Sequence, residues 1–142
     1  MSADISFFVE VYKNKQWQPF DVILDTPRMP LLFYVLLGYG NKETKEKYKD
    51  IPILCQGGEH YGWPSDVCTK NREFITSEIY NTHAAGWFTL DMADKYTSSL
   101  PAELLDISEV LSVTRFTSTD MKTLEIVTCL APQHIRILVT IS

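Results

Sequence analysis

Two carboxylates and a histidine are the residues of this chain whose types could perform chemistry. Asp4 and Glu10 fall on the same side of an alternating segment, which also carries Ser6. His83 lies far along the chain, just before Trp87. If the segment before Trp87 folds over the strand, Asp4, Glu10 and His83 could hold a divalent cation or perform acid-base steps, as in a hydrolase of nucleotides or nucleic acid. A solvent-exposed strand face with a hydrogen-bonding histidine explains the same pattern, and we favour that interpretation.

Arg28 is a second candidate, because it lies at the start of a strongly apolar segment that we predict to be a buried helix. A cation at a helix start opposes the helix dipole and therefore indicates an acidic partner. That partner is either Asp4 or Glu10 within the fold, or a ligand phosphate that also meets the N–H groups of the first turn. We expect Arg28 to face an open pocket and to bind a ligand or partner.

Aromatic residues and histidines gather in two segments that we interpret as loops because both contain glycine. These residues are His60, Tyr61, Trp63, His83 and Trp87. Aromatic rings beside glycines stack on bases or anchor protein interfaces, but large rings also fill ordinary cores. The pattern leaves the two interpretations open, and we take all five as candidate ligand-binding or partner-binding residues.

Three segments have the composition or the alternation of strands. They run from Asp4 to Tyr12, from Trp17 to Leu24 and from Ile135 to Ile141. The polar residues between the first two predict a hairpin, and Pro19 predicts that the second strand lies at an edge of the sheet. We expect the last strand to pair with the first.

Helices are predicted between these strands. The first begins at Pro27, includes the apolar run from Leu31 to Leu37 and is stopped by Gly38 and Gly40, and its lack of a polar stripe predicts burial on all sides. Further helices are expected from Pro64 toward Asn81, from Thr89 to Met92 onward, and from Ala102 to Leu111. Residues 118–130 fit a helix or a strand, and we favour the helix.

Together these elements predict one α+β domain over residues 1–142, with a small, mainly antiparallel sheet packed against about four helices, one of them fully buried. The chain has 142 residues, 45% of them hydrophobic, and a formal net charge of −5, which disfavours extended binding to nucleic acid. Neither a leader nor a membrane-spanning segment is visible, so we expect a cytoplasmic protein without a membrane partner. The odd number of cysteines indicates reduced, buried thiols, and no motif calls for a cofactor.

Six motifs, in order, resemble a family of small proteins of unassigned function that are often encoded by bacteriophages. The matching segments are Asp4 to Glu10, Lys15 to Trp17, Arg28 to Phe33, Gly62 to Val67, His83 to Leu90 and Ile135 to Ile137. The first is similar to the family's Asp-Ile-His-x-Phe-Val-Glu strand, and the fifth to its His-Ser-x-Ser-Trp-Leu-Thr-Leu segment. Ser6 stands where the family has a histidine, so a metal site built on that histidine would lack a ligand here. The resemblance implies a phage or mobile-element origin and no general activity.

We therefore expect a phage-encoded, non-enzymatic binding protein that acts on a host protein or a small nucleotide. We expect its target to be a host factor of a defence system, which it inhibits. The acidic composition suits occupation of a basic site on another protein. The alternative is the metal-dependent hydrolase with Asp4, Glu10 and His83 as ligands.

Overall fold

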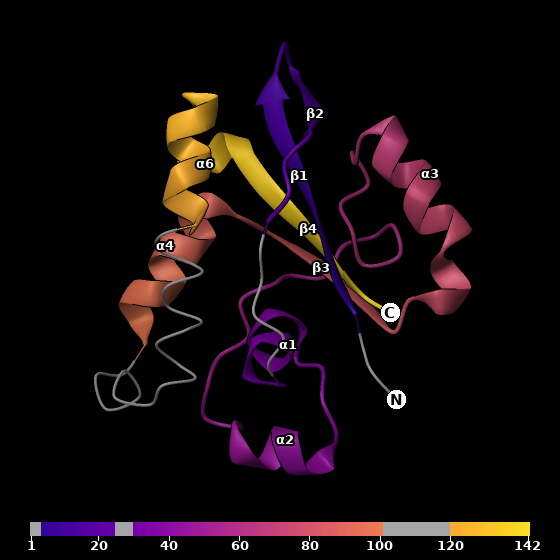
Figure 1. Cartoon of the computed structure of the whole chain (residues 1–142), viewed down its shortest axis with the longest axis vertical. Coiled ribbons are helices and arrows are strands. Elements are labelled where there is room, and N and C mark those ends of the chain that lie inside the picture. The colour runs from indigo at the N-terminus through magenta and orange to yellow at the C-terminus, as the bar shows by residue number, and fades with distance from the viewer. Residues whose placement is uncertain (1–3, 25–29, 101–119) are drawn as a thin grey trace.

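The structure is a computed structural model and describes residues 4–24, 30–100 and 120–142. These residues form a four-stranded antiparallel sheet of the strands β1 (Ile5–Lys13), β2 (Gln16–Phe20), β3 (Ala84–Thr89) and β4 (Ile135–Ile141). The strand order is β2-β1-β4-β3, so the first and last strands pair at the centre, as expected (Figure 1). The α+β class is confirmed.

The hairpin of β1 and β2 follows from local turn chemistry. Asn14 and Lys15 both have positive φ angles, 53° and 64°, which gives the two-residue turn a twist that matches the strands on either side. Lys13 pairs with Gln16, and the register continues to Val9 opposite Phe20. The predicted edge position of Pro19 is confirmed, because β2 stands at one end of the strand order of the described sheet.

One face of the sheet carries the main core. β1 and β4 turn their alternate apolar side chains to this face, where three helices cover them: α1 (Pro30–Leu37), α4 (Leu90–Ser99) and α6 (Met121–Thr128). Helix α1 confirms the predicted buried segment, since Leu31, Leu32 and Leu36 are fully buried. The short helix α2 (Lys42–Lys47) follows α1 and contributes no buried residue.

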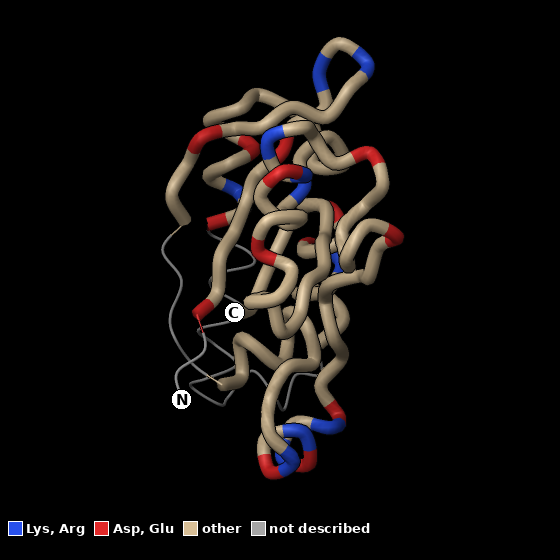
Figure 2. Tube along the Cα trace, turned by 90° about the vertical axis from the view of Figure 1, so that its right-hand side faces the viewer, with Lys and Arg blue, Asp and Glu red and all other residues tan. Residues whose placement is uncertain are grey.

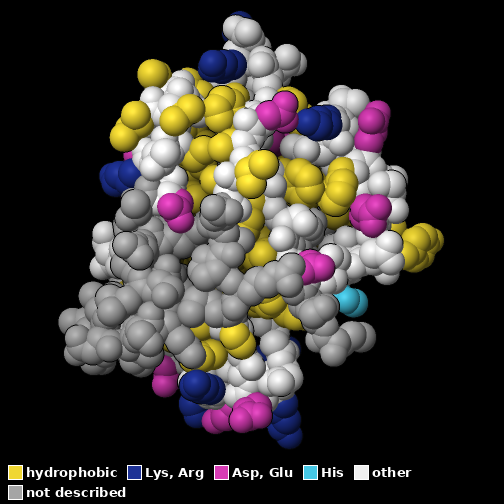
Figure 3. Space-filling model, in the orientation of Figure 1, with side chains coloured by type: hydrophobic (Ala, Val, Ile, Leu, Met, Phe, Trp, Pro, Cys, Tyr) yellow, Lys and Arg dark blue, Asp and Glu magenta, His cyan; other side chains and the backbone are white. Residues whose placement is uncertain are grey.

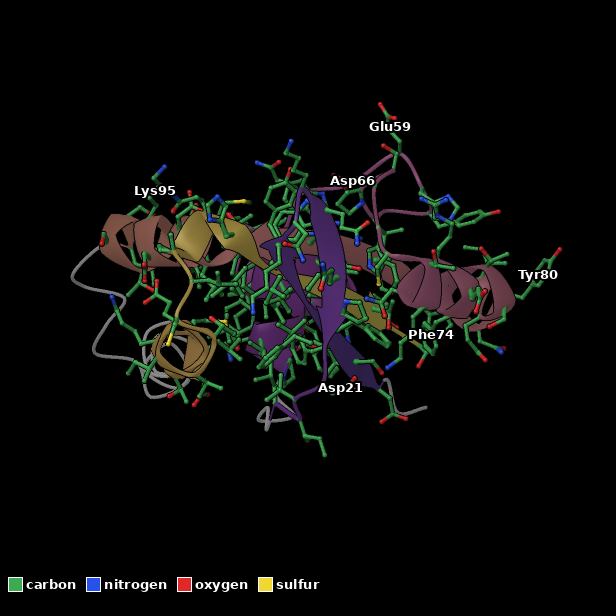
Figure 4. The ribbon with its side chains drawn as sticks, turned by 90° about the horizontal axis from the view of Figure 1, so that it is seen from above. Asp21, Glu59, Asp66, Phe74, Tyr80 and Lys95 are labelled. Atoms are coloured by element: carbon green, nitrogen blue, oxygen red, sulfur yellow. The ribbon has the colours of Figure 1, made fainter. Side chains whose placement is uncertain are left out.

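The opposite face carries a second, smaller core beneath α3 (Thr69–Ser77) and the loop that leads into it. Trp63, Val67, Ile75 and Leu138 form this second core, and Phe74 packs against it from the side of α3 that faces the sheet (Figure 4). The same view from above shows the sheet between two layers, with Lys95 of α4 on one side and Tyr80 beyond α3 on the other. The short 3₁₀ helices Ile79–Asn81 and Pro132–His134 complete the described elements.

Several predicted boundaries were wrong. The segment after His83, read as a loop, is strand β3, and Gly86 lies within that strand rather than in a turn. Helix α3 begins at Thr69 rather than near Pro64, because the residues between them form a loop that packs on the sheet. Only Gly38 has a left-handed φ, 69°, at the stop of α1, whereas Gly40 does not.

The ambiguous segment after residue 118 is helical where it is described, since α6 starts at Met121. The start of a helix near Thr89 is confirmed by α4. The helix expected from residue 102 to 111 and the start of the first helix at residues 25–29 lie outside the described residues. No helix among the described ranges is long and apolar enough to cross a bilayer.

The three cysteines are free thiols. Cys55 and Cys68 are partly buried, but Cys129 is exposed, so the expectation that all three are buried was wrong.

Candidate binding site

A buried ion pair joins the two central strands at the hairpin end of the sheet. Glu10 of β1 lies directly opposite Arg136 of β4, and both point to the α3 face. Their side chains are 0% and 3% exposed, with Arg136 Nη2 2.6 Å and Nε 2.9 Å from Glu10 Oε1. Two opposite charges that have lost their water must be paired and hydrogen-bonded to be tolerated. The pair therefore needs further hydrogen bonds from the groups around it.

The remaining bonds of the pair attach it to the segment that leads into α3. Glu10 Oε2 accepts from the backbone N–H of Cys68 at 3.0 Å and from Asn71 Nδ2 at 2.8 Å. Arg136 Nη1 donates to Asp66 Oδ1 at 2.9 Å, and its guanidinium carbon lies 4.0 Å from the ring centroid of Trp17. Glu10 thus caps the start of α3, and the guanidinium of Arg136 packs on the ring of Trp17 in a cation–π contact.

Next to this network, between the hairpin and the start of α3, lies an open hollow of about 520 Å³. It is lined by Tyr12, Lys15, Gln16, Trp17, Gln18, Pro19, Asp66, Val67, Cys68, Thr69 and Lys70. The rings of Tyr12 and Trp17 are in contact, with centroids 5.3 Å apart, and His134 lies 5.8 Å from Tyr12. The hairpin tip projects beyond α3 (Figure 1), and the rings of Tyr12 and Trp17 line the hollow as an aromatic floor.

A second hollow of about 480 Å³ continues along β2, because it shares Pro19 and Lys70 with the first. Its lining is mostly apolar and includes Phe8, Phe20, Val22 and Ile23. We call the two hollows together the β2 groove. Figure 3 shows hydrophobic side chains between the hairpin and α3 on the face turned to the viewer, with acidic and basic side chains beside them.

Several ionisable groups that line the β2 groove form ion pairs. Asp66 pairs with Arg136, and Lys70 Nζ lies 3.1 Å from Asp21 Oδ1. Burial, together with the nearby carboxylate of Glu10, raises the pKa of the Cys68 thiol to about 11. A thiol that is protonated near neutral pH is a poor nucleophile, so Cys68 is unsuited to covalent catalysis. The groove offers contact surfaces rather than an activated group.

The metal ligands of the alternative hydrolase hypothesis do not lie together in the structure. Asp4 and Glu10 do share one side of β1, but that side is covered at Glu10 rather than open to solvent. Six residues of extended strand place their Cα atoms about 20 Å apart. His83 lies near the Asp4 end, where its N–H donates to the carbonyl of Ile141 at 2.7 Å. Within residues 4–24, 30–100 and 120–142, no group of three or more His, Cys, Asp and Glu residues is placed to hold a metal ion.

The predicted aromatic candidates divide between core and surface. Trp63 is fully buried and donates from Nε1 to the carbonyl of Val139 at 3.1 Å, so it is a core residue. Trp87 packs against the same core from β3. The rings of His60 and Tyr61 are in tilted contact in a loop, with centroids 4.7 Å apart, and the ring of His83 stacks on that of Tyr39 with centroids 6.2 Å apart.

Arg28 lies outside the described residues, so its pocket stays a prediction. One of the two carboxylates proposed for it, Glu10, is instead paired with Arg136. Arg136, Trp17 and Tyr12 were not predicted as site residues from the sequence. A usable signal was present, since Glu10 and Arg136 interrupt strongly apolar strands near opposite ends of the chain, and unlike charges in two paired central strands commonly face each other.

Compared with protein-family models, with curated proteins and with solved structures, the chain matches none of them.

Proposed function

We propose that this chain is a phage-encoded, non-enzymatic binding protein that acts on a host protein in the host cytoplasm and inhibits a defence system. The binding role is supported by one observation, the β2 groove. Its floor is made of Tyr12 and Trp17, the residue types that most often anchor protein interfaces. The phage origin rests on the resemblance of the ordered motifs described above, and the host target is proposed from that origin.

The shape of the groove favours a protein segment over a small nucleotide. Two hollows that share Pro19 and Lys70 form an elongated depression along β2. A nucleotide could stack on Trp17 with its phosphates near Lys15, but it would occupy only the hairpin end. An extended chain would contact both hollows.

The test is affinity capture from a bacterial host lysate with the wild-type chain and two tryptophan variants. Thr69 lines the groove at the first position of α3, whereas Thr76, two turns along the same helix, is also exposed but does not line the groove. Thr69→Trp should fill the groove and remove the captured protein, and Thr76→Trp should leave capture unchanged. Mass spectrometry identifies the captured protein and any small molecule, and binding is then measured with purified components.

Capture that survives Thr69→Trp would show that the groove is not the binding site. Recovery of neither a protein nor a nucleotide by the wild-type chain would count against the binding role itself.

A further inference from the structure

The hairpin end of the β2 groove is basic, although the molecule as a whole carries a net charge of −5. Lys13 precedes the turn and Lys15 lies in it, and the turn projects beyond the body of the molecule with basic residues on both of its sides (Figure 2). Among the described residues neither lysine has an ion-pair partner, whereas Asp66, the acidic residue that lines this end, shares the single charge of Arg136 with Glu10. The two lysines outnumber the one carboxylate charge that Arg136 leaves uncompensated. The surplus of positive charge at this end would attract carboxylates.

The next cation along the groove forms only a weak ion pair. Lys70 pairs with Asp21, but their side chains are 65% and 90% exposed. A salt bridge this exposed adds little to stability. A carboxylate from a partner can therefore replace Asp21 beside Lys70 at little cost. Lys15 and Lys70 are then two cations along one groove that can bind carboxylates of a partner.

The backbone of β2 limits how a partner strand could pair. Lys13 and Gln16 close the two-residue turn, so the alternation of the ladder turns the backbone groups of Gln16, Gln18 and Phe20 toward β1. The groups of Trp17 and Pro19 then point away from the sheet. Proline has no N–H, so an added chain can exchange two hydrogen bonds with Trp17 but cannot continue a full ladder. Side-chain contacts must supply the rest.

The far end of the groove is apolar. Val22 is 38% exposed and Ile23 is 92% exposed, and both line the second hollow with Phe20. An apolar side chain of a partner would be partly removed from water at this end.

We propose that the β2 groove binds an acidic, extended peptide segment of the partner protein. Its carboxylates lie beside Lys15 and Lys70, its backbone pairs with Trp17, and an apolar side chain packs on Val22 and Ile23. This inference rests on the proposed function and adds the chemistry of the partner segment.

The experiment measures the affinity of the full chain for three fluorescein-labelled peptides by fluorescence anisotropy. Each peptide has about ten residues, enough in extended form to reach from Gln16 to Ile23. In all three peptides one half consists of Val and Ile. The other half is rich in Glu in the first peptide, in Gln in the second and in Lys in the third. We expect the Glu peptide to bind about tenfold more tightly than the Lys peptide, with the Gln peptide between them and with affinity that falls as salt rises.

Two charge reversals separate the local charge from the net charge. Lys15→Glu should weaken binding of the Glu peptide about tenfold and remove the preference for it. Lys45→Glu changes the net charge equally but lies in α2, at the end of the molecule opposite the hairpin (Figure 1), so the preference should remain.

NMR of the indole N–H groups locates the bound peptide. The chain has three tryptophans, and the Trp17 signal should shift on titration with the Glu peptide. The Trp63 signal should not, because its N–H is buried and bonded to Val139. Equal binding of the Lys peptide, absence of binding by all three peptides, or binding without a shift at Trp17 would each overturn this inference. If host-protein capture still depends on Thr69 in those cases, the proposed function stands and only the peptide chemistry is wrong.

Discussion

Replacing Arg136 tests the buried ion pair that holds the groove together. Arg136→Met keeps an unbranched side chain of related size but removes the cation. Glu10 Oε1 would then lose both of its hydrogen bonds, at 2.6 and 2.9 Å, while Oε2 keeps those from Cys68 and Asn71. The variant therefore contains a fully buried carboxylate without its counter-charge.

The magnitude follows from that burial. Removing one partner of a buried ion pair costs about 3–5 kcal/mol, because the remaining charge stays desolvated. Domains have a free energy of unfolding of roughly 5–15 kcal/mol, so the loss is a large fraction of the total. We expect the melting temperature to fall by on the order of 10 °C. The loss of the contact between the guanidinium and Trp17 adds to the effect in the same direction.

Urea denaturation followed by circular dichroism measures this loss, and a double-mutant cycle identifies its cause. Glu10→Gln combined with Arg136→Met has no buried charge, and the amide still accepts a hydrogen bond from Asn71. The double variant should recover about half of the lost stability or more. A loss below about 1 kcal/mol in Arg136→Met, or losses that simply add in the double variant, would refute the reasoning.

The other predictions concern single residues. Cys129 is exposed and should be alkylated readily near neutral pH. The pKa of Cys68 is raised to about 11, so its thiolate is scarce at lower pH. Alkylation of Cys68 should therefore become fast only as the pH approaches that value. Mass spectrometry after timed alkylation at several pH values measures both rates, and equal rates at neutral pH would contradict the buried environment of Cys68. Gly62→Ala should cost more than about 1 kcal/mol in urea denaturation, since its φ is 94° and the new Cβ would lie 2.6 Å from a backbone oxygen of β3. Gly57→Ala, with no atom within 4 Å of its new Cβ, serves as the near-neutral control, and equal losses would contradict the close approach. Trp63→Ala should cost about 3–5 kcal/mol by the same measurement, and unchanged stability would show that Trp63 is not a core residue.

The candidate site illustrates what a single sequence leaves open. The alternation of β1 correctly placed Glu10 on the side opposite Val9 and Val11. Alternation divides a strand into two sides, but it does not say whether the second side is covered. Here α3 and its leading loop cover that side, so Glu10 is a buried partner of Arg136. The two residues are far apart in sequence, and only the pairing of β1 with β4 brings them together.

Local physical chemistry by itself determined the hairpin, the edge position of Pro19, the C-terminal strand and helix α1 with its left-handed stop at Gly38. Each of these depends on side-chain periodicity or on a turn, which involve residues close in sequence. Strand β3 was missed because Ala84, Ala85 and Gly86 are weak strand formers, and the segment is extended through its pairing with β4 and with Gln56. The tertiary structure alone decided that Trp63 is core, that Arg136 supports Trp17, and that a groove lies along β2. These features depend on which distant segments share a face of the sheet, and no local pattern specifies that.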